Sequence, residues 1–488
     1  MNTLVAALDN GGLGYARTAN GARTLPTSGS KNVDLFSSIA SAKDLHQVVH
    51  SFAQAYAEDK RIATAVALWS RDVRGGAGRR AAFRQILQYL EVNDFEVFTR
   101  VIARVPELGR WDDVLCVKTD AGRTIAFGMI AQALANGDRL CAKWMPRKST
   151  PGNITAAQLR QFLDLTPKQY RKLLVNLTEV VESKMCAREW ESITYEHLPS
   201  VAAARYARAF GKRDGERYTA FLESLKKDPS KKINVGALYP HDLYRTAMQG
   251  GQDEYATQAW ARLPNFIKDG LKILPLVDTS GSMQTTASGS ITCMQVAVSL
   301  GLYLAERNTG PFQNHAINFN TNSRWLTANP KQSLRQRLMS IQTNDWGGST
   351  NLQSAFDLIL NTAVTHRVPA EDMPTHLLIL SDMEFNAACR MDNSGSYYNR
   401  MSAHASENFN VIDAKYARAG YKRPQIIFWN LNARAGNSPV NLLENGTALI
   451  SGFSPAILKS ALSLETVTPL DVMLDTVLVD RYDVLKDV

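Results

Sequence analysis

The stretch LKILPLVDTSGS (residues 271–282) is a continuous apolar run that ends in an acid and two serines. Three similar apolar runs follow it, at residues 315–320, 375–382 and 424–431. Amphipathic helical patterns separate and follow these runs, at residues 291–307, 331–341, 351–365, 407–419 and 469–485. Strands without polar alternation are buried on both faces, and their alternation with helices is typical of a doubly wound parallel sheet. We therefore predict an α/β domain over residues 269–488.

The sequence before this domain has a different pattern. From residue 34 to residue 268, apolar residues recur at helical spacing in segments such as AKDLHQVVHSFAQAYAED, short polar breaks separate the segments, and strand alternation is scarce. Many short helices with short connections predict stacked helix pairs, so we expect an α-helical repeat domain over residues 34–268. Residues 1–33 are rich in Gly, Thr, Ser and Asn and are predicted to form an extended arm.

The positive charge of the chain is concentrated in its first half. Residues 1–270 carry 38 Lys and Arg against 28 Asp and Glu, whereas residues 271–488 carry 17 against 18. This asymmetry favours an anionic partner for the helical part, with nucleic acid first. A merely basic domain without such a partner is an equally common cause of the same charge.

Several classes of protein are disfavoured by the sequence. Apolar runs fall short of the roughly 20 residues that a membrane helix needs, and MNTLVAALDN lacks the basic and apolar regions of a signal peptide. The five cysteines are scattered without a CxxC pair, which fits a reducing cytoplasm. HExxH and GxSxG motifs are absent, so we expect no enzymatic activity.

One set of residues has the chemistry of a metal site. Asp278, Ser280 and Ser282 form an Asp-x-Ser-x-Ser motif at the carboxyl end of the first strand, where open α/β sheets bind ligands. Thr350 precedes a helix in a GGST loop, and Asp382 ends the run at 375–382. Hard oxygen ligands suit Mg²⁺ or another hard divalent cation. Helix caps and turns favour the same residue types, but three separated loops agree, so we predict a metal site.

This arrangement resembles the von Willebrand factor A domain and its metal-ion-dependent adhesion site, over about residues 271–465. The resemblance implies that Ser280, Ser282 and Thr350 contact the metal directly. It also implies that Asp278 and Asp382 hold the metal largely through water. The sixth coordination position would stay open for the carboxylate of a protein ligand or another anion.

The chain as a whole resembles the TROVE-module proteins, the Ro autoantigen family, in a divergent branch of viral and plant type. The matching pieces are LWSRDVRGGAGRR (68–80), GRWDD (109–113), AKWMP (142–146), IFWNLN (427–432) and residues 440–455. The resemblance implies a ring of HEAT-like helical repeats closed by the A domain within one chain, so we expect a monomer. It further implies binding of small structured RNAs on the outer face of the ring and of single-stranded RNA ends in a basic central hole.

Basic residues that could contact RNA lie in three segments. Arginines flank Gly75-Gly76-Ala77-Gly78, where glycine amides beside a helix start could bind a phosphate, and cations surround Trp144, which could stack an unpaired base. The alternatives are a helix–helix turn in which Asp72 pairs with an arginine, and a core tryptophan beside solvated lysines. The candidate RNA contacts are Arg71, Arg74, Arg79, Arg80, Lys143, Arg147, Lys148, Arg208, Lys212 and Arg213.

Two functions follow from the sequence. The first is a Ro-like RNA-binding protein without catalytic activity, in which an A domain with a divalent metal closes a basic helical ring. The second is a metal-dependent protein-interaction scaffold within a viral or multi-protein assembly. RNA that co-purifies with the protein would favour the first, and binding of a protein only in the presence of Mg²⁺ would favour the second.

Overall fold

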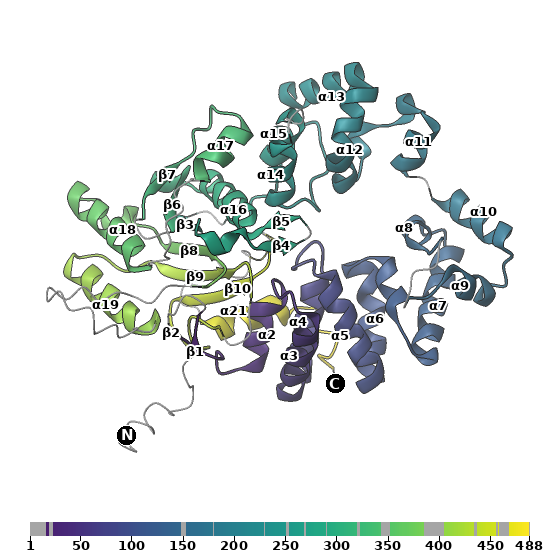
Figure 1. The fold of residues 1–488 in the computed structure, drawn as a ribbon, viewed down its shortest axis with the longest axis horizontal. Helices are drawn as coiled ribbons and strands as arrows, with labels where there is room; N and C mark the ends of the chain where they lie inside the picture. The colour runs from purple at the N-terminus through teal and green to yellow at the C-terminus, as the bar shows by residue number, and fades with distance from the viewer. Residues whose placement is uncertain are drawn as a thin grey trace. The chain divides into compact units, whose positions relative to one another are not determined.

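The computed structural model divides the chain into two compact units, which we describe separately. The α/β unit comprises Met1–Lys43 and Leu238–Thr476, and the helical unit comprises Asp44–Ala237 and Val477–Val488 (Figure 1). The structure describes all residues except 1–15, 19–22, 148–152, 179, 229, 250–252, 268–269, 289, 320–322, 343–351, 385–404, 434–436, 455–456, 458–467 and 488.

A six-stranded sheet forms the centre of the α/β unit, in the order β10-β9-β8-β3-β6-β7. Its strands are β3 Ile273–Asp278, β6 His315–Phe319, β7 Trp325–Thr327, β8 His376–Ser381, β9 Gln425–Asn430 and β10 Thr447–Ser451. Neighbouring strands are parallel except β6 and β7. The sheet confirms the α/β prediction for the carboxyl-terminal part, and the four apolar runs of the sequence correspond to β3, β6, β8 and β9.

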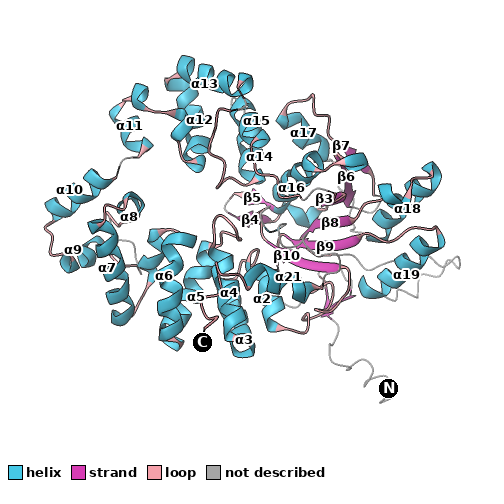
Figure 2. Cartoon of the chain, turned by 180° about the vertical axis from the view of Figure 1, so that it is seen from behind, coloured by secondary structure: helices cyan, strands magenta, loops and turns pink. Residues whose placement is uncertain are grey.

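Helices flank this sheet, as the view from behind also shows (Figure 2). The helices of the unit are α2 Lys31–Ile39, α14 Pro240–Met248, α15 Asp253–Ala261, α16 Cys293–Arg307, α17 Leu334–Ile341, α18 Leu352–His366, α19 Ala405–Arg418 and α21 Pro469–Val477. Short 3-10 turns lie at Gly281–Gln284 (η4), Gly310–Phe312 (η5) and Ala370–Asp372 (η6), and two small hairpins pair β1 Ala16–Arg17 with β2 Arg23–Thr24 and β4 Thr286–Ser288 with β5 Ile291–Thr292. Helix α16 packs closely on β3. A Cβ atom at Gly301 would lie only 2.5 Å from the Val277 side chain, so this close approach requires glycine.

The helical unit is built from consecutive helices, and many of the connections between them are very short. Its elements are α3 Leu45–Glu58, α4 Lys60–Arg71, α5 Arg80–Asn93, α6 Phe95–Leu108, η1 Trp111–Cys116, α7 Asp120–Ala135, α8 Arg139–Trp144, α9 Ala156–Phe162, α10 Pro167–Leu177, α11 Val181–Ala187, η2 Trp190–Ser192, η3 Tyr195–His197, α12 Ser200–Arg213 and α13 Gly215–Lys227. Asp59 and Asp94 each end one helix and begin the next. Their carboxylates accept hydrogen bonds from the free amides of Ile62 and Val97, which is why one residue suffices as a connection.

The two units exchange segments of the chain, so they do not follow the domain boundaries expected from the sequence. Residues 23–28 and α2 belong to the α/β unit, where Leu25 exchanges backbone hydrogen bonds with Ser438 and α2 packs on β10. Helices α14 and α15 also belong to this unit and not to the repeat array. The helix predicted at 469–485 ends at Val477, and the residues after it join the helical unit. Helical periodicity identifies a helix but not the body against which it packs.

Among the described residues, no helix is both long enough and apolar enough to cross a membrane. Helix α16 lies in the amphipathic pattern predicted at residues 291–307, and most of its side chains are buried.

Candidate functional site

The predicted metal site lies where β3 and β8 end side by side. The two strands are parallel neighbours and Val277 pairs with Leu380, which brings Asp278 next to Ser381. The Ser381 hydroxyl donates to the Asp278 carboxylate at 2.6 Å, and the backbone amide of Ser280 donates to its other oxygen at 2.9 Å. Asp278 is fully buried. The sheet therefore holds this carboxylate in one fixed orientation.

Further oxygen donors surround Asp278. The hydroxyls of Ser280 and Ser282 lie 3.1 Å apart on the loop after β3. Asp382 is buried at the turn after β8 and accepts from the amide of Glu384 at 3.3 Å. Two carboxylates and two hydroxyls from two neighbouring strand ends form a donor set of the kind that hard cations prefer. Thr350, the predicted fifth member, lies outside the described residues.

The electrostatics of the site agree with this donor set. Burial and the nearby charge of Asp382 raise the pKa of Asp278 to about 7, although hydrogen bonds from Ser381 and Ser280 act to lower it. A divalent cation between the two carboxylates would offset their repulsion, and the residues present fit such an ion. Within the described part of the chain, no three residues among His, Cys, Asp and Glu are grouped so that they could hold a metal. A metal would therefore depend on the serine hydroxyls.

In the helical unit, three of the sequence segments that carry the family resemblance come together. Arg71, at the end of α4, donates to the Asp113 carboxylate through Nε at 2.8 Å and lies 2.6 Å from it through Nη2. Both side chains are buried, with exposed fractions of 1% and 0%. Arg71 was predicted as an RNA contact, but it is a structural ion-pair partner inside the unit.

An arginine cluster lies on the surface above this buried pair. We define it as Arg80, Arg84 and Arg110 around the Asp112 carboxylate. Arg110 lies 2.6 Å, Arg84 3.0 Å and Arg80 3.7 Å from Asp112. Three guanidinium groups thus surround the one Asp112 carboxylate. Burial, and then repulsion from Arg110 and Arg84, lower the pKa of Arg80, against the attraction of Asp112 and Asp113. Arg80 remains 47% exposed.

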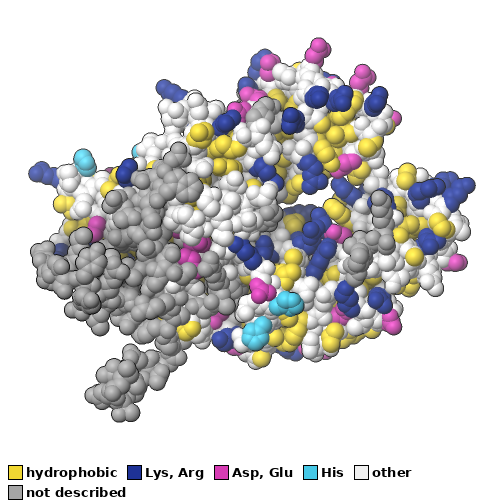
Figure 3. All heavy atoms as spheres, in the orientation of Figure 1, with side chains coloured by type: hydrophobic (Ala, Val, Ile, Leu, Met, Phe, Trp, Pro, Cys, Tyr) yellow, Lys and Arg dark blue, Asp and Glu magenta, His cyan; other side chains and the backbone are white. Residues whose placement is uncertain are grey.

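An aromatic side chain adjoins the arginine cluster. The guanidinium of Arg110 lies 3.8 Å from the centre of the Trp144 ring, and the Lys143 ammonium lies 5.7 Å from it. Trp144 is half-buried, so it is neither a core tryptophan nor a fully free ring. Lys143 and Trp144 thus extend the arginine cluster along α8. Figure 3 shows Lys and Arg side chains gathered over the connection between α4 and α5, and again over α10.

The glycine-rich loop after α4 does not present its amides to a ligand as expected. The amides of Ala77, Gly78 and Arg79 donate to backbone carbonyls of Trp69, Asp72 and Ser70. A Cβ at Gly76 would lie 1.9 Å from the Trp69 carbonyl oxygen. The glycines therefore permit a tight turn onto the end of α4, and the amides of Ala77, Gly78 and Arg79 are not available to bind a phosphate.

The remaining candidate RNA contacts have different surroundings. Arg74 is exposed and donates to the Glu107 carbonyl at 2.9 Å, and Arg79 is half-buried, which lowers its pKa. Arg147 is exposed and donates to the Lys143 carbonyl at 3.2 Å, whereas Lys148 lies outside the described residues. Arg208, Lys212 and Arg213 are all exposed on α12.

Comparisons with known proteins give relatives but no activity. Residues 122–272 match a family described as "Domain of unknown function (DUF2828)", and residues 272–477 match one described as "Domain of unknown function (DUF7788)". The chain is 28% identical over 514 residues to "Uncharacterized protein L728" of Acanthamoeba polyphaga mimivirus, covering 94% of this chain and 86% of that protein. The crystal structure of the Deinococcus radiodurans Ro (RSR) protein aligns with 88% of this chain and 90% of its own, at 15% identity and a TM-score of 0.34. A score of this size does not establish a common fold.

Sequence reasoning missed several residues of both sites. The Ser381 hydroxyl holds the Asp278 carboxylate by a hydrogen bond. The signal for it in the sequence was a serine directly before the aspartate that follows β8. Glu384 is buried beside the metal-site candidates, and Asn437 donates to the Met383 carbonyl at 3.1 Å. Arg110 gave no signal of its own, because its contact with Trp144 spans 34 positions of the chain.

Proposed function

We propose that this protein is a Ro-like RNA-binding protein and that its helical unit binds RNA through the arginine cluster. The observation that carries the proposal is the placement of Arg80, Arg84 and Arg110 around Asp112, with Trp144 stacked beside them. The basic excess of residues 1–270 supports the same surface.

The chemistry of the arginine cluster suits a nucleic-acid backbone. Guanidinium groups bind phosphate oxygens in a bidentate geometry, and phosphate contacts dominate affinity for nucleic acids. Asp112 holds the three arginines in place, so less side-chain freedom is lost when a phosphate binds. The Trp144 ring offers a surface for an unpaired base, which a duplex cannot supply. We therefore expect structured RNAs with single-stranded ends to bind better than plain duplex.

The variant Arg80→Glu/Lys143→Glu should bind RNA more weakly than the wild type. Single-stranded RNA loses about 0.7 log unit of affinity per phosphate contact for each tenfold rise in salt, so the loss of two contacts should flatten the slope by about 1.4. A filter-binding series from low to physiological salt measures both quantities. The matched control is Lys331→Glu/Arg335→Glu, which reverses two exposed charges in the α/β unit.

Two results would count against this proposal. Wild-type affinity weaker than micromolar at low salt would remove the RNA-binding function itself. Equal affinities and slopes for the cluster variant and its control would show that RNA binds elsewhere. Matched circular dichroism spectra of all proteins are needed, because an unfolded variant would imitate the expected loss.

We also propose that the α/β unit is a von Willebrand factor A-like domain that binds one hard divalent cation such as Mg²⁺. Asp278, Ser280, Ser282 and Asp382 would hold the ion, with Thr350 as the further ligand. What supports this is the pair of buried carboxylates at adjoining strand ends beside two serine hydroxyls 3.1 Å apart. The ion would supply a positive charge that a carboxylate of a partner could share.

Asp278→Ala should abolish Mg²⁺ binding and leave the protein folded. Removal of this carboxylate takes away a ligand but also relieves its repulsion with Asp382, so the fold has no new buried charge to accommodate. Isothermal titration calorimetry measures the binding, and Asp372→Ala, at an exposed acid of the same unit, is the control. Unchanged Mg²⁺ affinity in Asp278→Ala would refute the assignment.

The metal site also supports the second candidate function, a metal-dependent protein-interaction scaffold. A preparation free of RNA that binds a protein only with Mg²⁺, and not after Asp278→Ala, would favour it over RNA binding. The HEAT-like ring, its closure within one monomer, the cytoplasmic location and the lack of enzymatic activity stay predictions.

A further inference from the structure

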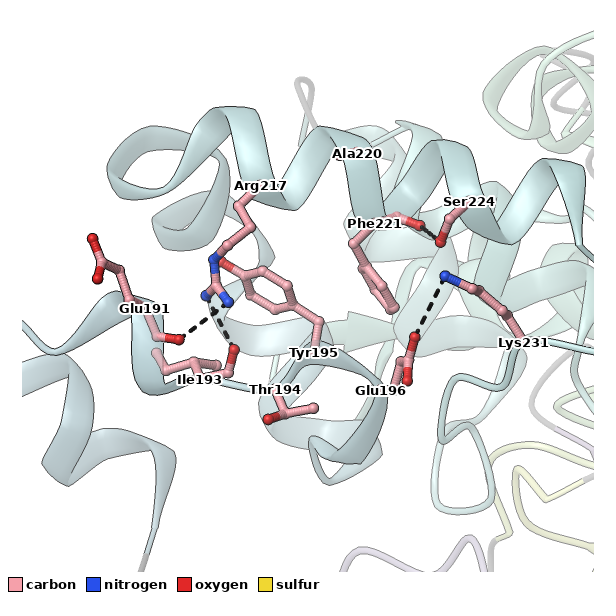
Figure 4. A pocket seen from close by; sticks show the side chains of 10 residues that line it. All are labelled: Glu191, Ile193, Thr194, Tyr195, Glu196, Arg217, Ala220, Phe221, Ser224 and Lys231. Atoms are coloured by element: carbon pink, nitrogen blue, oxygen red, sulfur yellow. Dashed lines mark hydrogen bonds and ion pairs between the residues drawn. The ribbon is translucent and has the colours of Figure 1, made fainter.

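A pocket of about 390 Å³ opens on the helical unit between α13 and the segment 191–196. Its size is in the range of small-molecule sites. The rings of Tyr195 and Phe221 lie side by side in its lining, and Glu196 and Lys231 stand together at one end of it (Figure 4). The pocket therefore combines an aromatic wall with two acids, Glu191 and Glu196, and two bases, Arg217 and Lys231.

The aromatic wall is rigidly supported from behind. The ring centres of Tyr195 and Phe221 are 5.4 Å apart, and the Tyr195 hydroxyl donates to Asp214 at 2.5 Å. The Arg217 guanidinium lies 4.9 Å from the centre of the Tyr195 ring and donates to the carbonyls of Trp190 and Ile193 at 2.6 and 3.0 Å. Arg217 thus fixes the segment that carries Tyr195, and the wall needs no reorganisation when a flat ligand packs on it.

The two charged groups at the end of the pocket are only loosely joined. Lys231 and Glu196 are 3.8 Å apart, and their side chains are 39% and 43% exposed. An exposed pair at this distance contributes little stability, so a ligand can separate the two charges at small cost. Lys232, the next residue after Lys231 in the sequence, is exposed.

We propose that this pocket binds one unpaired guanine nucleotide of the RNA. The base packs against Phe221 and Tyr195, and the Glu196 carboxylate accepts from the N1–H and N2–H groups of guanine. Adenine presents an acceptor at N1, and uracil flanks its single N–H with carbonyl oxygens, so neither matches a carboxylate. The proposal rests on the RNA-binding function argued above and adds a base preference to it.

The test compares two single-stranded RNAs, hexauridylate and the same hexamer with one guanine, by fluorescence anisotropy with the full chain. We expect the guanine-containing strand to bind at least about fivefold tighter, as one bidentate base contact provides. Glu196→Gln and Phe221→Ala should bring this ratio to one. Lys227→Gln, on the same helix but not in the pocket lining, should leave it unchanged. Guanosine and adenosine monophosphates, titrated by NMR, probe the pocket without the rest of the RNA.

The outcomes separate this proposal from the RNA-binding function. Equal affinity for the two hexamers, together with equal binding of the two mononucleotides, overturns the guanine pocket and leaves RNA binding by the arginine cluster intact. A ratio that persists in Phe221→Ala and Glu196→Gln also overturns it. Arg80→Glu/Lys143→Glu should weaken both hexamers alike and preserve the ratio, which supports two separate contacts. Absence of all RNA binding removes both proposals.

Discussion

Asp113→Ala is expected to unfold the helical unit under conditions in which the wild type is folded. The Asp113 carboxylate accepts from Arg71 at 2.8 Å, from Arg84 at 2.7 Å and from the amide of Arg110 at 3.1 Å. Its loss leaves the guanidinium of Arg71 buried without a partner carboxylate. Breaking a buried pair in this way costs about 3–5 kcal/mol of the free energy of unfolding. Urea unfolding followed by circular dichroism measures the change.

Asp112→Ala is the matched control for this experiment. Asp112 also pairs with arginines, but it is 20% exposed and its partners reach solvent, so we expect a loss of at most about 1 kcal/mol. If Asp112→Ala and Asp113→Ala shifted the urea midpoint equally, the buried pair would not have the structural role given to it here.

Deletion of residues 480–488 should destabilise the helical unit to a similar extent. Asp72 is fully buried beside the glycine-rich loop, where it accepts from Arg481 at 2.6 Å, from the Tyr482 hydroxyl at 2.8 Å and from the amide of Arg74 at 2.9 Å. The deletion removes the first two donors and leaves a buried carboxylate, again at a cost of about 3–5 kcal/mol. Lys486→Ala, which breaks an exposed pair with Asp480, is the control.

The effect of this deletion should depend on pH. Burial alone would raise the pKa of Asp72, but Arg481, the Arg74 amide and Tyr482 outweigh it and hold the pKa below its ordinary value of 3.8. In the wild type this carboxylate therefore contributes stability above about pH 4, and the contribution is lost as the pH falls further. In the protein without residues 480–488, fewer hydrogen-bond donors oppose the rise in the pKa of Asp72 that burial causes. The difference in unfolding free energy between the two proteins should thus be larger at pH 7 than at pH 4, and equal differences would contradict the role of Asp72.

Part of the fold followed directly from the sequence. The strands β3, β8 and β9 each contain a longer unbroken apolar stretch, so their runs were visible, whereas β10 (TALIS) has a shorter one between polar ends and β7 (WLT) is shorter still. The meeting of Asp278 and Asp382 was also predictable, because the carboxyl ends of parallel strands lie at one edge. The packing of α14 and α15 on the α/β unit was not, since it depends on contacts distant in the chain.

The basic surface was predicted less well, for a physical reason. The sequence alone does not show whether an arginine will be buried in an ion pair with a carboxylate. Arg71 and Arg80 stand nine positions apart, yet one is enclosed with Asp113 and the other is half-exposed beside Asp112. The glycines after α4 were equally ambiguous, because a tight turn and an anion site both favour glycine.

The exchange of segments between the units has a consequence during synthesis on the ribosome. Arg61 pairs with Asp483, which is synthesised 422 residues later. Helix α2 likewise packs on β10, which is synthesised long after it. At typical rates of translation, 422 residues take roughly 20 to 80 seconds. During that time the nascent helices α3–α13 lack Arg481 and Tyr482, which contact Asp72. Helix α2 lacks the sheet on which it packs. We expect such intermediates to associate with chaperones, and the helical unit not to reach its final stability before residue 483 has left the ribosome.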